Sequence, residues 1–131
     1  MDLAAADQDQ QLTHEIIGAA IQVHRYLGPG LLESVYQYCL EIELKEKGLA
    51  YQREEAVPLT YRNRTLDCGF RFDFLIENKV VVELKSIDRL LPIHEAQLLT
   101  YLRLLNKQVG LLINFNEPVL KKGIRRCVLG G

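Results

Sequence analysis

The sequence lacks the features that mark membrane proteins, disulfide-stapled proteins and zinc proteins. No apolar run approaches the roughly 20 residues that a membrane-spanning helix needs. Its three cysteines, Cys39, Cys68 and Cys127, are widely spaced and form no CxxC pair. A zinc or iron–sulfur site therefore has little support. We expect the three cysteines to be reduced and partly buried, as small side chains often are.

An excess of charge of either sign is also missing. The 131 residues include 16 Lys and Arg and 17 Asp and Glu, for a net charge of -1. This balance argues against a protein that grips nucleic acid through overall positive charge, although a local groove stays possible. The densest basic stretch, Lys121, Lys122, Arg125 and Arg126, indicates by itself a solvated face. The polar, acidic N-terminus lacks the pattern of a secretion signal, which favours a cytoplasmic location.

Composition and periodicity predict an α+β domain. Apolar residues make up 48% and charged residues 25%, as in ordinary globular proteins. We expect a disordered N-terminus at residues 1–10 and a single domain at residues 11–131, with no membrane contact. Apolar spacing predicts helices at residues 12–27, 31–47 and 93–106, and strands at 51–61, 65–76, 80–87, 109–115 and 124–129. The order ααβββαββ indicates a mixed sheet flanked by helices.

Two predicted strands bring two acids together. The loop Glu77-Asn78-Lys79 suggests a tight hairpin turn. If Ile76 pairs with Val80, Asp73 lies directly opposite Glu83, with Cβ atoms about 4.5–5.5 Å apart. Two carboxylates at this distance repel each other unless a positive charge lies between them.

Two interpretations of this pair stay open on spacing alone. In the first, the carboxylates hold Mg²⁺ or Mn²⁺, and Lys85 on the same face stabilises charge on a phosphate or orients a water. In the second, Arg71 and Lys85 neutralise the acids in a cross-strand network. The preceding Val80-Val81-Val82 run suggests burial on both faces, which favours the metal because buried charges need partners.

Polar residues of two predicted helices are further candidates. His94, Gln97 and Tyr101 share one face of a helix, where Gln97 and Tyr101 could bond a phosphate or fix Lys85. Two of the three histidines, His24 and His94, have the simpler interpretation of structural side chains. Glu33 follows the Gly28-Pro29-Gly30 break and, taken alone, is an acid in the first turn of a helix.

Together these residues resemble the PD-(D/E)XK nuclease superfamily, in particular its GxxExxY branch. The motifs are Gly30-Leu31-Leu32-Glu33-Ser34-Val35-Tyr36, then Phe70-Arg71-Phe72-Asp73, then Glu83-Leu84-Lys85, then Gln97-Leu98-Leu99-Thr100-Tyr101. The last is similar to the QxxxY motif of RecB-type nucleases. The likeness spans roughly residues 16–115. Phe72 stands where many members have proline, at a position that varies in the superfamily.

The resemblance implies a restriction-endonuclease-like core with a four-stranded mixed central sheet. It implies that Asp73, Glu83, the Leu84 carbonyl and Glu33 hold a metal, and that Lys85 is catalytic. The supporting or nucleic-acid-binding residues that it implies are Gln97, Tyr101, Tyr36 and Arg71.

The leading hypothesis is therefore a Mg²⁺- or Mn²⁺-dependent nuclease that hydrolyses phosphodiester bonds in DNA or RNA. The alternative is a catalytically silent module of the same fold that binds nucleic acid or a protein partner. The weak net charge favours this alternative, and it also suggests that catalysis could need a homodimer or a partner. A third possibility is a nuclease for a small or modified nucleotide, which would need less basic surface.

Overall fold

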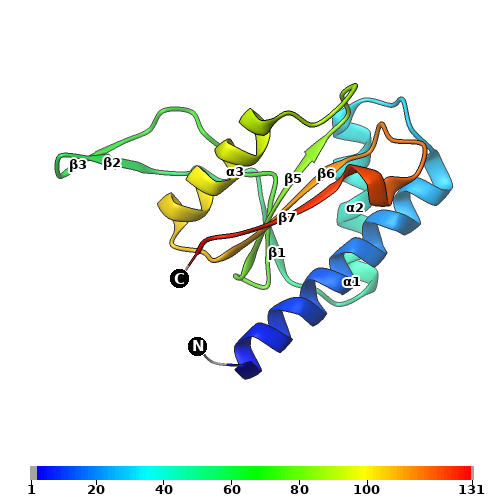
Figure 1. Ribbon diagram of the computed structural model, residues 1–131, viewed down its shortest axis with the longest axis horizontal. Helices are drawn as coiled ribbons and strands as arrows, with labels where there is room; N and C mark the ends of the chain where they lie inside the picture. Colours follow the sequence, from blue (N-terminus) through cyan, green and yellow to red (C-terminus); the bar gives the residue numbers. More distant parts are fainter. Residues whose placement is uncertain (1–2, 131) are drawn as a thin grey trace.

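A five-stranded sheet forms the centre of the computed structural model, with two helices on one face and one on the other (Figure 1). The structure describes the backbone of residues 3–130 and the side chains of residues 9–130. The helices are α1 (Leu3–Leu27), α2 (Glu33–Glu46) and α3 (Pro92–Leu105), with a short 3-10 helix η1 (Leu120–Gly123). The strands are β1 (Tyr51–Arg53), β2 (Leu59–Tyr61), β3 (Arg64–Leu66), β4 (Phe74–Ile76), β5 (Val80–Lys85), β6 (Val109–Asn114) and β7 (Ile124–Val128). This is the α+β, restriction-endonuclease-like arrangement that we expected.

The strand order in the sheet is β1-β4-β5-β6-β7. Among the strands of residues 3–130, β5 and β6 alone run parallel, and α3 makes the crossover that a parallel pair requires. The other neighbouring strands are antiparallel. The predicted register is confirmed, because Ile76 pairs with Val80.

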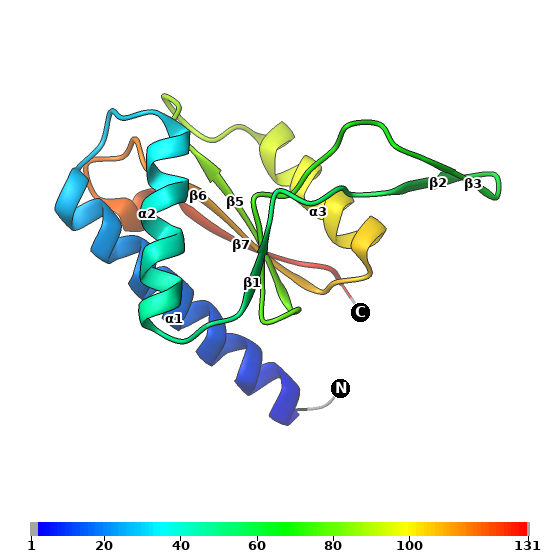
Figure 2. The ribbon, with the colours of Figure 1, turned by 180° about the vertical axis from the view of Figure 1, so that it is seen from behind.

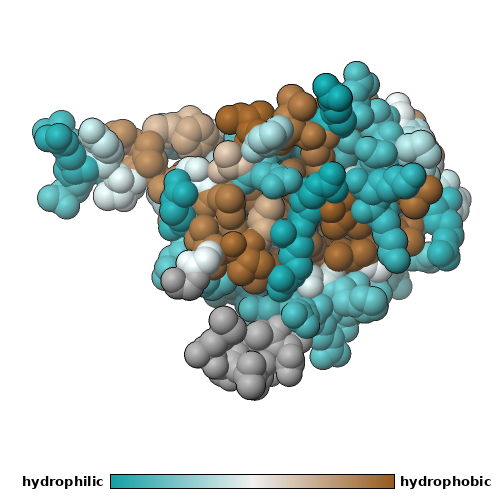
Figure 3. Space-filling model, in the orientation of Figure 1, coloured by the Kyte–Doolittle hydropathy of each residue, from teal (hydrophilic) through white to brown (hydrophobic). Residues whose placement is uncertain are grey.

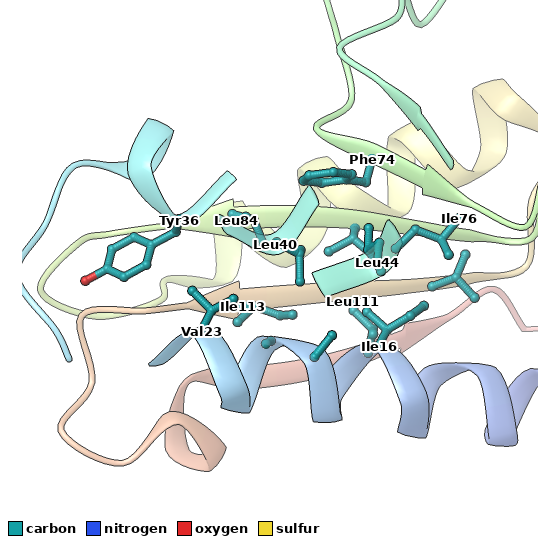
Figure 4. Close-up of a cluster of buried hydrophobic side chains, with 14 of the residues drawn as sticks. Ile16, Val23, Tyr36, Leu40, Leu44, Phe74, Ile76, Leu84, Leu111 and Ile113 are labelled. Atoms are coloured by element: carbon teal, nitrogen blue, oxygen red, sulfur yellow. The ribbon is translucent and has the colours of Figure 1, made fainter. Parts of the chain in front are cut away.

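The larger core lies between the sheet and the α1–α2 pair (Figures 2 and 4). Ile16 of α1 and Leu40 of α2 meet Phe74, Leu84 and Leu111 of the sheet, and all five are fully buried. The second core lies beneath α3, where Leu98 and Leu102 pack on Val81 and Leu112. Burial of both faces explains why β5 and β6 are almost continuously apolar.

The helix boundaries differ from expectation mainly at the N-terminus. α1 begins at Leu3 instead of near residue 12, so residues 3–10, expected to be disordered, have helical backbone. The expectation for Met1 and Asp2 falls outside the described residues. Thr13 lies inside the helix and donates a hydrogen bond to the Gln10 carbonyl at 2.9 Å. The alanine- and glutamine-rich start of the chain favours helix, which explains the longer element. None of the described helices has the length and apolar character for crossing a membrane.

Two of the expected strands are wrong as continuous elements. Residues 51–61 divide into β1 and β2, and residues 65–76 divide into β3 and β4, so the helices and strands follow the order ααβββββαββ. β2 and β3 pair only with each other, as a hairpin outside the central sheet. The resemblance implied four central strands, and the structure has five because β1 joins β4. Pro58 lacks an amide donor, which is consistent with a break in pairing before β2.

A continuous strand at residues 65–76 would place Phe70, Phe72, Phe74 and Ile76 on one face, and this expectation is also wrong. Phe74 and Ile76 belong to the core under α1 and α2, whereas Phe72 is buried in the core under α3. A bend at Asp73 separates Phe72 from Phe74 and ends the period-two alternation.

Candidate active site

The sheet opens between β4 and β5 at Asp73, immediately before β4 begins. Pairing of β4 with β5 ends at Phe74 and Val82. The preceding residues pair instead with the segment after β1, where the Glu54 amide donates to the Asp73 carbonyl at 3.2 Å. The Asp73 carboxylate faces β5, and its Oδ2 accepts a hydrogen bond from the Leu84 amide at 2.7 Å. The Leu84 carbonyl lies at the same strand edge, because the amide and carbonyl of one residue in a strand project the same way.

Glu83 is buried beside Asp73, as the register predicted. Its side chain is 9% exposed and shares the α3 face of the sheet with Val81 and Lys85. Burial, then the neighbouring Asp73 carboxylate, raises the pKa of Glu83 to about 10, and Lys85 opposes this shift. The Glu83 Oε1 atom is buried without a hydrogen-bond partner. An acid in this state is expensive to ionise unless a cation joins it.

The alternative of a cross-strand salt-bridge network is not what the structure contains. Among the side chains of residues 9–130, the ion pairs within 4.0 Å are Arg53–Glu41, Arg53–Glu54 and Arg125–Glu95. Arg71 is exposed and lies opposite Ala56 in an isolated bridge. Lys85 is half-buried and lowers the pKa of Glu83 through its charge, without a direct ion pair. Among the described side chains, none forms an ion pair with Asp73 or Glu83, so their negative charge is not neutralised.

Glu33 approaches the same point from the first turn of α2. It is half-buried, and its pKa is raised by burial first and then by the Asp73 charge. Three hydrogen bonds hold the preceding loop in place. The Tyr36 hydroxyl donates to the Gly28 carbonyl at 2.6 Å and accepts from the Leu31 amide at 3.1 Å. The Ser86 hydroxyl, just after β5, donates to the Leu31 carbonyl at 2.6 Å.

Tyr36 belongs to the core instead of a nucleic-acid-binding surface. Its side chain is fully buried, and its ring stacks on Phe115 with centroids 4.4 Å apart. Gly28 and Gly30 have φ values of 71° and 94°, which non-glycine residues adopt only with strain. Gly28 and Gly30 thus allow the backbone conformation of this loop, and the Tyr36 hydrogen bonds hold the loop in place. Tyr36 supports the site by positioning Glu33.

α3 brings Gln97 and Tyr101 to the acids. The Gln97 Nε2 donates to the Tyr101 hydroxyl at 3.2 Å. The pKa of Tyr101 is raised by burial first and then by the Glu83 charge, with a smaller contribution from Asp73. Phe70 was not predicted as a neighbour of the site, because alternation along residues 65–76 places it on the same face as Phe74 and Ile76. Its ring lies against Tyr101, with centroids 6.0 Å apart.

His24 and His94 are structural, as expected. The His94 Nδ1 accepts a hydrogen bond from the Leu91 amide at the start of α3. A His24 ring nitrogen lies 2.7 Å from the Glu117 carbonyl.

A buried asparagine that sequence analysis missed supports the end of β5. Asn114 is fully buried at the end of β6, opposite Lys85. It bonds the Ile87 amide and carbonyl at 3.1 and 2.9 Å. The sequence signal was present, since an amide at the end of an apolar strand needs partners.

The metal-ligand chemistry available here is that of oxygen donors. Asp73 and Glu83 form the pair, and Glu33 lies within reach of the Asp73 charge. Over the described part of the chain, no group of three or more His, Cys, Asp and Glu side chains is gathered closely enough to hold a metal ion. The site thus offers two carboxylates and a backbone carbonyl, a set that suits Mg²⁺ with water as the remaining ligands.

A protein-family model matches most of the chain. The sequence model of the PD-(D/E)XK nuclease superfamily matches residues 10–127, which include every residue of the site described above. Neither the curated proteins nor the solved structures include a match to this chain.

Proposed function

Because the chain belongs to the PD-(D/E)XK nuclease superfamily, we propose that it is a metal-dependent nuclease that hydrolyses phosphodiester bonds in DNA or RNA. One observation carries the proposal: Glu83 is buried against Asp73, and its Oε1 has no hydrogen-bond partner. We also propose that it belongs to the GxxExxY branch. The sequence Gly30-Leu31-Leu32-Glu33-Ser34-Val35-Tyr36 supports this, since Tyr36 fastens the loop that carries Glu33 to the acids.

The residues present fit a hard divalent cation. A cation would supply the positive charge that the buried pair lacks, and no ion pair within 4.0 Å supplies it among the described side chains. Asp73, Glu83 and the Leu84 carbonyl would hold Mg²⁺ or Mn²⁺, because these ions prefer oxygen ligands. Glu33 would help to hold the ion or a water. A bound cation would polarise the phosphate and ease deprotonation of the attacking water.

Lys85 has the catalytic role in this proposal. It lies on the same strand face as Glu83, two residues along β5, and is accessible enough to meet a phosphate oxygen. Its ammonium would stabilise the charge that develops on the phosphate. Gln97 and Tyr101, joined by their hydrogen bond, would hold the α3 side of the site or contact the nucleic acid. Arg71, exposed beside Asp73, would bind a neighbouring phosphate.

One observation favours the silent binding module as a second candidate. Only two carboxylates form the central pair, and no third joins them closely in the described part of the chain. Such a site could have lost its metal while the fold still binds nucleic acid or a protein partner.

A cleavage assay separates the two candidates. The purified protein is incubated with Mg²⁺ or Mn²⁺ on single- and double-stranded DNA and RNA, beside Asp73→Asn, Glu83→Gln and Lys85→Ala. We expect cleavage that needs metal. Asp73→Asn and Glu83→Gln should abolish it, and Lys85→Ala should slow it by about 10²- to 10³-fold. Glu46→Gln, an exposed acid at the end of α2, is the matched control and should cut like the wild type.

Activity that survives all three site substitutions would assign the cleavage to a contaminant. A protein that neither cuts any substrate nor binds metal in calorimetry would favour the silent module.

A further inference from the structure

The hairpin β2–β3 projects from the body of the protein beyond α3 (Figures 1 and 2). Every residue of β3 is exposed, and in β2 only Leu59 is half-buried. The hairpin therefore adds little to either core. Because an isolated two-stranded hairpin is marginally stable at best, packing alone does not account for this arm.

The tip of the hairpin carries two positive charges. Arg62 and Arg64 flank Asn63, and the end of the arm is hydrophilic (Figure 3). Neither arginine has an ion-pair partner within 4.0 Å among the side chains of residues 9–130. Arg62 and Asn63 both have positive φ, 49° and 63°. This conformation suits Gly or Asn in a tight hairpin turn, so an arginine there is strained.

The base of the hairpin is fastened to the acidic site. The Val57 amide donates to the Phe70 carbonyl at 2.8 Å, and the Phe70 ring lies against Tyr101. After β3, the chain leads back to Asp73, immediately before β4. Arg64 lies nine positions before Asp73 in the sequence, so the arm reaches at most about 30 Å from the acids. One helical turn of DNA is about 34 Å long.

We propose that the hairpin β2–β3 is a DNA-gripping arm, whose Arg62 and Arg64 bind backbone phosphates of duplex DNA within one turn of the acids. This inference rests on the proposed nuclease function. The major groove of B-form DNA admits a two-stranded β-ribbon, whereas the major groove of A-form RNA is too narrow to be read by side chains. Since the whole chain has a net charge of -1, its average surface does not attract the DNA backbone. The two arginines at the tip of the hairpin supply local positive charge that does.

The test is the binding of a fluorescein-labelled duplex DNA of about two helical turns, measured by fluorescence anisotropy in EDTA so that no cleavage occurs. Arg62→Ala/Arg64→Ala is compared with Lys121→Ala/Lys122→Ala, which removes the same charge from the exposed basic stretch at η1. We expect the hairpin variant to bind about 10- to 100-fold more weakly near 0.1 M salt and to lower the slope of log K against log salt by about 2. The η1 variant should bind nearly like the wild type. Both should keep the wild-type melting curve, since all four side chains are exposed.

Equal losses of DNA affinity in the two variants would contradict the proposed role of the hairpin. Unchanged DNA binding by the hairpin variant would contradict it too. Tighter binding of an RNA duplex of the same sequence, or no binding of duplex DNA by the wild type, would also overturn it. Cleavage with Mg²⁺ is scored separately. If the hairpin variant loses DNA binding but the wild type does not cleave DNA or RNA, the nuclease proposal fails and the proposal that the hairpin binds DNA is retained. If the wild type cuts and the hairpin variant binds normally, the arm alone fails.

Discussion

The Asp73 carboxylate accepts the backbone amide of Leu84, with Oδ2 2.7 Å from the nitrogen. A carboxylate thus takes the position that a backbone carbonyl of the neighbouring strand would hold if β4 continued alongside β5. The contact ties the acid to the strand that carries Glu83 and Lys85, so the three groups are fixed relative to one another. Rigid placement of this kind is what a metal or phosphate site requires.

Without divalent cations, the free energy of unfolding should fall as the pH rises. Burial and then Asp73 raise the pKa of Glu83 to about 10 in the folded protein, whereas the unfolded chain has the ordinary value near 4.3. Between about pH 5 and pH 10, the folded state holds a proton that the unfolded state has released. Rising pH therefore favours unfolding, and the free energy of unfolding falls by at most about 1.4 kcal/mol per pH unit. Urea titrations across this range measure the slope.

Glu83→Gln should remove most of this pH dependence, because the amide carries no titrating proton. The exposed Glu46→Gln should keep it. Identical slopes for the wild type and Glu83→Gln would mean that Glu83 is ionised in the folded protein.

Binding of Mg²⁺ should release protons. A carboxylate ligand must be deprotonated, and Glu83 with its raised pKa holds a proton at neutral pH. We expect about one proton released per ion near pH 7 and tighter binding as the pH rises. Calorimetry in two buffers of different ionisation enthalpy counts these protons. Binding with no proton release would place the ion away from Glu83.

Lys85→Ala should lower the cleavage rate by about 10²- to 10³-fold, because a group that stabilises charge only in the transition state is lost. Its affinity for Mg²⁺ should be unchanged or tighter, since the substitution removes a positive charge near the two acids. Lys79→Ala, an exposed lysine just before β5, is the matched control. An equal loss of rate in the two variants would argue against a catalytic role for Lys85.

Tyr36→Phe should destabilise the protein by about 1–3 kcal/mol, because the Gly28 carbonyl and the Leu31 amide lose their partner. Cleavage should fall further than the fraction of folded protein explains, since the loop positions Glu33. Tyr38→Phe alters a tyrosine that is 63% exposed and should leave both properties unchanged. Normal cleavage by folded Tyr36→Phe would show that the loop does not position Glu33.

Much of the site was predictable because it depends on local spacing. A short turn at Glu77-Asn78-Lys79 and two apolar strands leave few registers, and the confirmed Ile76–Val80 pair puts Asp73 opposite Glu83. Two helix boundaries followed from the same kind of pattern. α2 at Glu33–Glu46 and α3 at Pro92–Leu105 lie within two residues of the expected ranges, because the apolar period of a helix persists over several turns.

The hairpin was not predictable from alternation. Residues 51–61 and 65–76 are suitable strand formers throughout, yet only their outer ends join the central sheet. Whether the middle of such a strand stays in a sheet depends on which partner edge is free, and this is settled by long-range pairing. The bend at Asp73 likewise moved Phe72 to the opposite core and Phe70 against Tyr101.

By itself, the sequence determined the α+β class, the pairing of the acid strands and the identity of the candidate acids and lysine, since each follows from periodicity or from a short loop. Only the tertiary structure decided that Glu83 is buried without a hydrogen-bond partner for Oε1, that Tyr36 fastens the Glu33 loop and that a basic arm extends from Asp73. Burial and side-chain partnership depend on residues far apart in the chain, and α2, α3 and the sheet must pack before these contacts exist.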